Sequence, residues 1–341
     1  MTPRDSVKLA FQFQDSREIP FLFNCSEEQA KALSAHYGHE RWREIPRPYF
    51  HRITGVDNFL SLAGYQEVAP GRHKDCIGCV WEFGSTHHLI EPPLKEPSIN
   101  GFELPDIDQY FSKHLRPLWN QELAQGGESF RYVGHSFGLF ERAWSLRGFE
   151  NFLTDLVDNP EFCEELLEMI TDWMLQSIDH LVAAPIDAIR LTDDYADQRG
   201  VMFGLGRFRA FFKPHWKRIF SRIRKAGIYS VLHVCGCAAP AVPDLIECGL
   251  DCLESLQPEA MDIYKLKRDY GRDLRFWGGL GAQSTLPFGT PRDVRREVMR
   301  LKKQMGRGGG YILAGAKEIS EEVPPENVIA YLEEASAPMD R

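Results

Sequence analysis

The segment Tyr229–Gly236 reads Y-S-V-L-H-V-C-G, and it decides how the rest of the chain is interpreted. It begins as an apolar run of strand formers and ends with His233, Cys235 and Gly236. Two side chains that are two residues apart on a strand lie on the same face of the sheet. In a parallel barrel, the carboxyl ends of the strands bring such groups to the mouth. The segment therefore predicts one barrel strand with a chemical site at its end.

Strands and helices alternate from residue 130 onward. The predicted strands are Phe130–Gly134, Ala188–Thr192, Ser230–His233, Cys252–Leu256, Leu274–Gly278 and Tyr311–Ala314. The predicted helices are Phe149–Ala184 (divided near Asn159-Pro160), Gly206–Ala226 with an internal Pro214, Ala239–Glu247, Asp262–Tyr270, Pro291–Met305 and Pro325–Glu334. Such alternation implies parallel βαβ units. We therefore expect an α/β protein, a (β/α)8 TIM barrel.

The first 129 residues are less regular. They predict a helix over Ser6–Phe13, a strand over Ile19–Phe23, a helix from Glu27 to about Tyr37, a hairpin over Cys79–Leu89 and a helix near Asp106–Trp119. Ser26 is a good N-cap for the helix that starts at Glu27, and Gly38 is a good stop for the same helix. We expect residues 1–341 to form a single domain, with this part as a helical and hairpin extension.

Composition excludes several classes of function. The chain has 341 residues and a formal net charge of −9, without a basic block, which argues against a nucleic-acid binder. No apolar run spans a membrane, and no signal peptide is evident, so we expect a cytoplasmic protein with eight mostly reduced cysteines. No G-x-G-x-x-G follows a strand, so no nucleotide cofactor is expected. Gly306–Gly310 (G-R-G-G-G) is flexible enough to cradle a phosphate, but we interpret it as a turn at the non-catalytic end of the barrel.

Polar residues recur where the predicted strands end. His233 and Cys235 supply an imidazole nitrogen and a thiolate sulfur, which suit a borderline-soft ion such as zinc. The candidates for a third ligand are Cys237, Asp193 and Glu254. The alternative is that His233 bonds a neighbouring carboxylate while Cys235 is a small buried residue.

Three further pairs of residues have roles for which the sequence leaves alternatives. Of the adjacent Asp193 and Asp194, we expect one to face the lumen, for acid–base, ligand or substrate-anchoring work, and the other to cap a turn. Cys76 and Cys79 have C-x-x-C spacing, which fits zinc or a redox pair, although no second such pair accompanies them. The tandem histidines at 87 and 88 are interpreted as exposed or structural.

Several segments together resemble the uroporphyrinogen decarboxylase superfamily. They are F-G-L-F-E-R-A-W-S-L-R-G-F-E (137–150), T-D-D-Y-A-D-Q-R-G (192–200), H-V-C-G (233–236), P-D-L-I-E-C-G-L-D (243–251), F-W-G-G-L (276–280), L-P-F-G-T-P-R-D-V-R-R-E-V (286–298), G-G-G-Y-I-L-A (308–314) and V-P-P-E-N-V (323–328). The resemblance is strongest over 130–335 and implies a (β/α)8 barrel.

The resemblance implies one of two chemistries. True uroporphyrinogen decarboxylases carry an arginine-rich N-terminal motif, an aspartate that grips the pyrrole nitrogens and a late histidine, and none is evident here. The other branch comprises methyltransferases that work with a corrinoid protein, and its thiol-activating members hold zinc with an H-x-C pair and a late cysteine. His233 and Cys235 match the pair, but residues 313–318 read L-A-G-A-K-E, so Glu318 or Cys237 would have to replace the cysteine.

The resemblance thus predicts a methyltransferase that moves a methyl group from a small substrate, such as an O-methyl compound, to the cobalt of a separate corrinoid protein. The alternatives are a decarboxylase of a porphyrinogen or smaller carboxylate, and a non-catalytic barrel that binds a small molecule. A homodimer is left open as the oligomeric state. The site residues that we expect are Asp193, Asp194 and His233 for catalysis, His135, Gln198, Gln257 and Gln283 for substrate, and His233, Cys235 and Glu254 for zinc.

Overall fold

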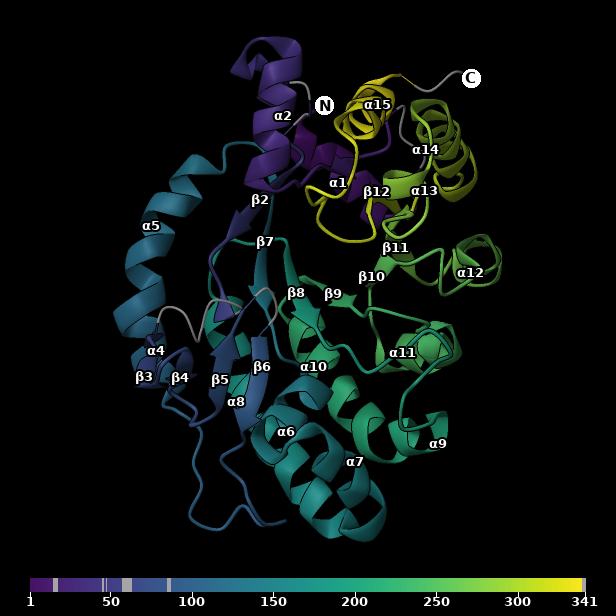
Figure 1. The fold of residues 1–341 in the computed structure, drawn as a ribbon. Coiled ribbons are helices and arrows are strands. Elements are labelled where there is room, and N and C mark those ends of the chain that lie inside the picture. Colours follow the sequence, from purple (N-terminus) through teal and green to yellow (C-terminus); the bar gives the residue numbers. More distant parts are fainter. Residues whose placement is uncertain (15–17, 45, 47, 57–62, 85–86, 339–341) are drawn as a thin grey trace.

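Eight parallel strands form a nearly closed barrel in this computed structural model, which describes residues 1–14, 18–44, 46, 48–56, 63–84 and 87–338 (Figure 1). The strands are β1 (Phe21–Leu22), β2 (Phe50–Ile53), β7 (Phe130–His135), β8 (Ala188–Thr192), β9 (Tyr229–His233), β10 (Cys252–Leu256), β11 (Arg275–Leu280) and β12 (Tyr311–Gly315). Their order around the barrel is β1-β12-β11-β10-β9-β8-β7-β2. The (β/α)8 prediction is confirmed, and within the described residues no ladder joins β1 to β2.

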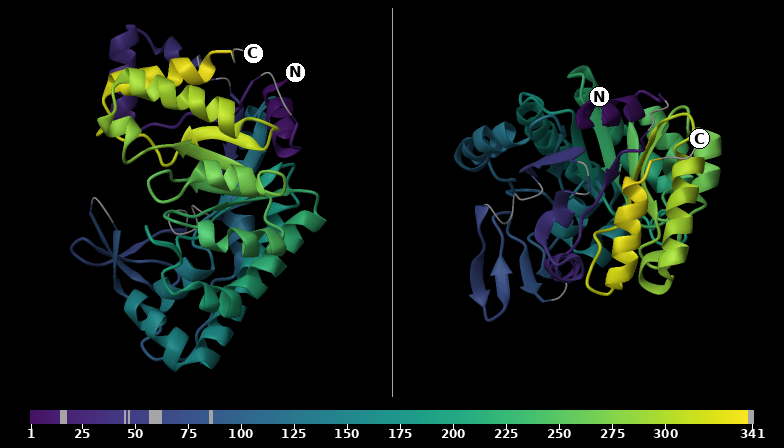
Figure 2. Two further views of the ribbon diagram at one scale, coloured as in Figure 1. Left: turned by 90° about the vertical axis from the view of Figure 1, so that its right-hand side faces the viewer. Right: turned by 90° about the horizontal axis from the view of Figure 1, so that it is seen from above.

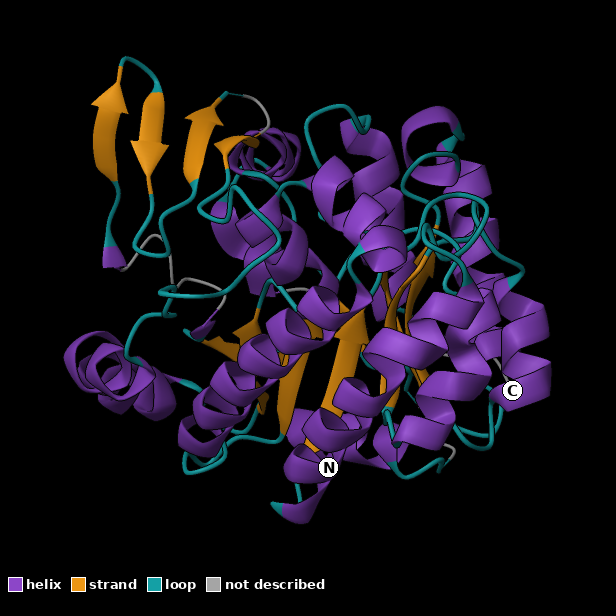
Figure 3. Ribbon diagram, turned by 90° about the horizontal axis from the view of Figure 1, so that it is seen from below, coloured by secondary structure: helices purple, strands orange, loops and turns teal. Residues whose placement is uncertain are grey.

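Helices surround the strands, as Figure 3 shows in a view from below Figure 1. They are α1 (Pro3–Phe11), α2 (Glu27–Tyr37), α4 (Ile107–Tyr110), α5 (Arg116–Gln125), α6 (Leu139–Arg147), α7 (Phe149–Asp158), α8 (Pro160–Leu181), α9 (Leu205–Arg207), α10 (Lys213–Lys225), α11 (Val242–Cys248), α12 (Ile263–Tyr270), α13 (Thr285–Phe288), α14 (Pro291–Met305) and α15 (Pro325–Ser336). None of the helices in the described ranges has both the length and the hydropathy that a membrane span requires.

The predicted helices occur, and their ends follow local chemistry. The side chain of Ser26 accepts a hydrogen bond from the amide of Gln29 at the start of α2, and Gly38 ends that helix in the left-handed conformation. Pro214, which has no N–H to donate, lies at the start of α10, and a π-helical turn over Phe208–Phe212 directly precedes it. The helix predicted over Gly206–Ala226 is therefore present as one run over 205–225, with a π-helical turn just before Pro214.

Several elements were not predicted from the sequence, among them two of the barrel and half of a second sheet. The barrel elements are β2 and α6, which are four and nine residues long. Beside the barrel stands an antiparallel sheet, shown in Figure 2, with strands β3 (Gln66–Ala69), β4 (Arg72–Lys74), β5 (Val80–Phe83) and β6 (His87–Glu91). Strands β5 and β6 are the predicted hairpin. Strands β3 and β4 are mostly exposed and carry no apolar alternation, so periodicity gives no signal for them.

Aromatic rings fill part of the barrel interior. Trp277 of β11 is buried, and its ring stacks on Phe50 of β2 at 4.6 Å and meets Tyr132 of β7 edge-on at 5.9 Å. Helix α1 packs at the N-terminal end of the barrel, where Arg4 forms an ion pair with Asp187 and the amide of Gly310 donates to the carbonyl of Ala10. The predicted role of the Gly306–Gly310 segment as a turn at that end agrees with this packing. The candidate site is therefore expected at the opposite end of the barrel, where the strands end.

A candidate active site at the barrel mouth

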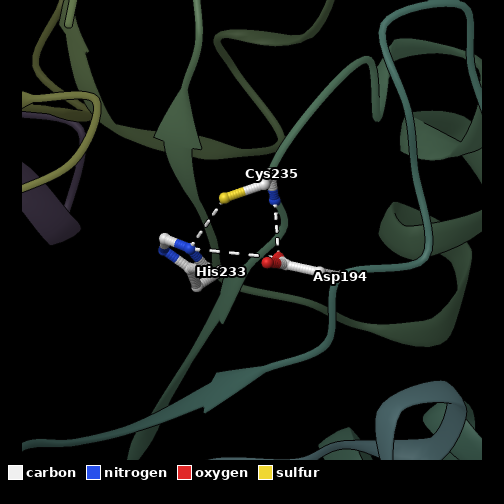
Figure 4. A group of neighbouring side chains, drawn as sticks. All are labelled: Asp194, His233 and Cys235. Atoms are coloured by element: carbon white, nitrogen blue, oxygen red, sulfur yellow. Dashed lines mark hydrogen bonds and ion pairs between the residues drawn. The ribbon is translucent and has the colours of Figure 1, made fainter. Parts of the chain in front are cut away.

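Three donor atoms converge where β8 and β9 end. The side chains belong to Asp194, His233 and Cys235, and their ligand atoms all lie within 4.8 Å of one another (Figure 4). Nε2 of His233 lies 3.4 Å from Sγ of Cys235 and 4.0 Å from Oδ1 of Asp194. The backbone amide of Cys235 donates to the same carboxylate oxygen at 2.8 Å. The oxygen, nitrogen and sulfur atoms form one cluster at the carboxyl ends of neighbouring strands.

The loop after His233 is held in place by its neighbours. Gly236 has a φ of +82°, and a Cβ there would lie 2.6 Å from the carbonyl oxygen of Asp197. Only glycine fits this close approach of two backbones. The amide of Gly236 donates to the side chain of Gln257, and the amide of Cys237 donates to the carbonyl of Asp197. The loops after β8, β9 and β10 thus fix the position of Cys235.

The other ring nitrogen of His233 faces a buried ion pair. Nδ1 lies 2.9 Å from Nη2 of Arg190 and 3.7 Å from Oε1 of Glu254, and Arg190 donates to Glu254 as well. Burial opposes the imidazolium, but contacts with Cys235 and Glu254 outweigh it and raise the pKa of His233 to about 10. Burial also opposes the Glu254 carboxylate, but Arg190 and His233 outweigh it and lower the pKa of Glu254 to about 2. Glu254 therefore lies on the side of the ring away from Asp194 and Cys235.

Asp193 and Asp194 point to different neighbours, as expected for adjacent residues at a strand end. Asp193 is fully buried and accepts hydrogen bonds from the amides of Phe140 and Glu141, at 3.1 and 2.9 Å, in the first turn of α6. Gly138, which precedes α6, allows this contact, because a Cβ there would lie 2.6 Å from Cβ of Asp193. Asp193 thus holds α6 at the barrel, whereas Asp194 belongs to the donor cluster.

Glu141 is a site residue that the sequence analysis did not identify. It lies in the first turn of α6, and burial together with the Asp194 carboxylate raises its pKa to about 7. A carboxyl group with such a pKa can hold or release a proton near neutral pH. Its signal in the sequence was the segment 137–150, which matched the family pattern although no helix had been assigned there.

A cavity of about 210 Å³ opens beside His233 inside the barrel mouth. Its charged lining residues are Arg52, Arg190, Glu254, Lys317 and Glu318, which come from β2, β8, β10 and the loop after β12. Leu22, Asn24, Tyr132 and Ala314–Ile319 complete the wall together with His233. Glu318 therefore faces this cavity rather than the three-donor cluster.

The four residues expected to bind substrate lie outside the lining of this cavity. His135 is fully buried, and Gln257 is buried with its amide oxygen bonded to Gly236. Gln198 and Gln283 are exposed on the loops after β8 and β11. These four residues lie at or just after strand ends at the mouth of the barrel, as predicted. The position of a residue at a strand end does not determine the direction in which its side chain points.

Cys76 and Cys79 lie in the turn between β4 and β5 of the second sheet, and no other ligand type joins them in a metal-binding group within the described ranges. Desolvation raises the pKa of Cys76 to about 11, although this residue is exposed, and burial raises the pKa of Cys79 well above its usual value, so both thiols are protonated near neutral pH. Asp75 organises the turn between them by accepting from the amides of Ile77 and Cys79 and from the indole of Trp81. The C-x-x-C spacing thus belongs to a well-ordered turn.

The donor set fits a zinc ion with an open position. Zinc binds imidazole nitrogen, thiolate sulfur and carboxylate oxygen, and catalytic sites use three protein ligands. Asp194, His233 and Cys235 provide one of each from the carboxyl ends of β8 and β9. Cys237, also weighed as a ligand, is not part of the cluster.

Comparison with known proteins identifies the family. A family model described as "Uroporphyrinogen decarboxylase (URO-D)" matches residues 90–337, a range that begins before the segment of strongest resemblance. The chain is 23% identical over 204 residues to the methylcobamide:CoM methyltransferase MtaA of Methanosarcina barkeri, a match that covers 60% of this chain and 57% of that protein. It is 22% identical over 192 residues to the uroporphyrinogen decarboxylase of Methylococcus capsulatus, covering 55% of this chain and 52% of that protein.

A solved structure has the same fold from end to end. A methyltransferase from Methanosarcina mazei superposes with a TM-score of 0.74 and 19% identity, covering 98% of both chains. The curated relatives, in contrast, are matched over little more than half of their length. The family model covers most of the barrel and all three donors of the cluster. The chain belongs to the uroporphyrinogen decarboxylase (URO-D) family.

Proposed function

We propose that this protein is a methyltransferase that moves a methyl group from a small substrate, of the O-methyl class, to the cobalt of a separate corrinoid protein. The observation that carries the proposal is the convergence of Asp194, His233 and Cys235 at the barrel mouth. The similarity of the chain to the methyltransferase MtaA also supports this activity. The donor cluster favours it over decarboxylation, which has no need of a thiolate.

In this proposal Asp194, His233 and Cys235 hold a zinc ion, with Asp194 in the third position that the sequence analysis gave to Glu254. Zinc supplies Lewis acidity to a poor leaving group such as an alkoxide. For Nε2 of His233 to be a ligand, the ring proton must sit on Nδ1. Glu254 would be the acceptor for that proton, but its contact with Nδ1 is 3.7 Å, and the guanidinium of Arg190, which can only donate, lies at 2.9 Å. Zinc binding through Nε2 therefore requires Arg190 to move off Nδ1 and Glu254 to approach it. Arg190, which is closer to Nδ1, keeps Glu254 ionised.

The cavity beside His233 supports a small substrate. Its volume of about 210 Å³ is below the roughly 300–1,000 Å³ typical of sites for drug-sized ligands. A tetrapyrrole is larger than such ligands, so the cavity argues against a porphyrinogen. The charged lining suits a polar substrate, which Arg52, Lys317 and Glu318 would bind. Of the three donors only His233 lines this cavity, so the methyl group of the substrate would have to extend past the His233 ring to reach the zinc.

Two cysteines in one loop provide a matched experiment. Cys235 belongs to the donor cluster and Cys237 does not, so Cys235→Ala should lose bound zinc and methyl transfer to Co(I), while Cys237→Ala should keep both. The measurements are metal content of the purified proteins and the absorbance change of the corrinoid protein on methylation. Equal zinc content and equal transfer rates in the two variants would refute the assignment.

Measurements of CO₂ release and of ligand binding by the wild-type chain separate the alternatives. A decarboxylase would release CO₂ from a carboxylate substrate without any corrinoid protein, and a binding protein would retain a small ligand without turnover. Either result, obtained with the wild-type chain in place of methyl transfer, would replace the proposed function.

A further inference from the structure

A basic groove lies at the end of the barrel opposite His233. Helices α12 and α14 both end there, directly before β11 and β12 begin. The groove has a volume of about 980 Å³, and five of its lining side chains are cationic: Lys267, Arg268, Arg272, Lys303 and Arg307. No carboxylate lines it in the described part of the chain. In a chain with a net charge of −9, this is a marked local excess of positive charge.

Four of these cations have no internal counter-charge. Arg268, Arg272, Lys303 and Arg307 are exposed, and within the described ranges their side chains make neither a hydrogen bond nor an ion pair. Cations near a helix C-terminus are favourable, which accounts for Arg268 and Lys303 in last turns. Arg272 and Arg307 come after the helices, each following a capping glycine. Helix stability therefore does not explain why both loops add an arginine to one groove.

The glycine-rich segment brings backbone to the edge of this groove. Gly308, Gly309 and Gly310 all have positive φ, and a Cβ at Gly309 would lie 2.6 Å from the amide nitrogen of Gln14. Nζ of Lys267 donates to the carbonyl of Gly309 at 2.5 Å, which ties the segment to α12. A Cβ at Gly308 would meet open space, and both Arg307 and Gly308 line the groove.

We propose that this groove is an anion site for a ligand with a chain of phosphates. Arginine guanidinium groups bind phosphate oxygens in pairs, and three of the five cations are arginines. The concave shape and volume match a small molecule better than the flat surface of a macromolecule. The rings of Phe13 and Tyr264 also line the groove, so the ligand is either an inorganic oligophosphate or a nucleotide. The site is remote from His233 and independent of the proposed methyl transfer.

The test is calorimetric titration of the full chain with sodium tripolyphosphate and, separately, with a nucleoside triphosphate, at constant ionic strength. Saturable binding is expected, and the double variant Arg272→Ala/Arg307→Ala should weaken it by about tenfold or more. The control is Lys31→Ala/Arg292→Ala, which removes two exposed cations elsewhere and should bind like the wild type. Tighter binding of the nucleotide would identify it as the ligand type, and equal binding would identify the phosphate chain alone.

The proposal fails if neither probe binds beyond the effect of sodium chloride at the same ionic strength. It also fails if the Arg272→Ala/Arg307→Ala protein binds as tightly as the wild type, or if only an acidic polypeptide or RNA binds. Melting curves without ligand will show whether the variants are folded, since both arginines lie in exposed turns.

Discussion

The backbone amide of Cys235 donates a 2.8 Å hydrogen bond to Oδ1 of Asp194, the oxygen that also lies 4.0 Å from Nε2 of His233. One carboxylate thus serves both as the anchor of the loop after β9 and as a member of the donor cluster. The two roles make different demands, because the anchor needs only an acceptor oxygen, whereas a zinc ligand needs the negative charge.

Asp194→Asn separates these two roles. The amide oxygen can still accept from Cys235, so the fold should be retained. The loss of charge should lower zinc affinity by at least about tenfold, measured by competition with a chromogenic chelator. Asp194→Ala, which removes the anchor too, is the comparison. If Asp194→Asn binds zinc like the wild type, Asp194 is an anchor and not a ligand.

Glu254→Gln tests the ion pair behind His233. The substitution leaves the partly buried guanidinium of Arg190 without its counter-charge, which should cost about 3–5 kcal/mol of unfolding free energy. Urea denaturation measures this cost. The double variant Arg190→Met/Glu254→Met removes both charges and should recover much of the loss. A double variant as unstable as Glu254→Gln would show that charge pairing is not what stabilises this layer.

His135 makes stability depend on pH. It is fully buried, neither ring nitrogen has a hydrogen-bond partner within the described ranges, and burial lowers its pKa from 6.5 to about 4. The unfolded chain therefore binds the proton first as the pH falls. Stability is unaffected above pH 6.5, decreases below it and levels off near pH 4. This residue alone should cost about 2 kcal/mol between pH 7.5 and pH 5.

The measurement is the unfolding free energy of the wild type and of His135→Phe at both pH values. The variant should lose about 2 kcal/mol less between them, whatever its stability at pH 7.5. His36→Gln, at an exposed position, is the control and should follow the wild type. Identical pH profiles for the wild type and His135→Phe would contradict the prediction.

Gly138→Ala tests the contact between α6 and β8. The added Cβ would lie 2.6 Å from Cβ of Asp193 and 2.9 Å from the carbonyl oxygen of Thr192, so α6 must shift. We expect a loss of about 1–3 kcal/mol in unfolding free energy. Gly206→Ala is the matched control, because a Cβ there meets nothing within 4 Å. Equal stability of the two variants would mean that α6 adjusts without cost.

The parallel barrel was predictable because each later strand is a short apolar run bounded by turn residues, as in Cys252–Leu256 and Tyr311–Gly315. Two barrel elements were not. Strand β2 has three partly or fully accessible residues out of four, and α6 is only nine residues long with buried Arg142 and Arg147 on it. Both depend on tertiary contacts, which periodicity does not record.

The geometry of the candidate site was predictable only in part. The spacing of His233 and Cys235 placed them correctly on one side of a strand end. Which of Asp193, Asp194 and Glu254 joins His233 and Cys235 in the donor cluster depends on how the neighbouring strands are staggered. Glu254 precedes Ser255, whose φ of +51° marks a bulge in β10, and the sequence gives no sign of that irregularity.

The seam between β1 and β2 has a consequence for the cavity. The two strands are bridged by side chains, such as the rings of Phe21 and Tyr49 at 5.7 Å, and by no backbone hydrogen bond within the described ranges. Leu22 and Arg52, which line the cavity, stand on either side of this seam. Separation of the two strands there would break side-chain contacts, including the hydrogen bond from the Tyr49 hydroxyl to Glu18. Passage of a molecule through that side would leave every rung of the eight-stranded ladder intact.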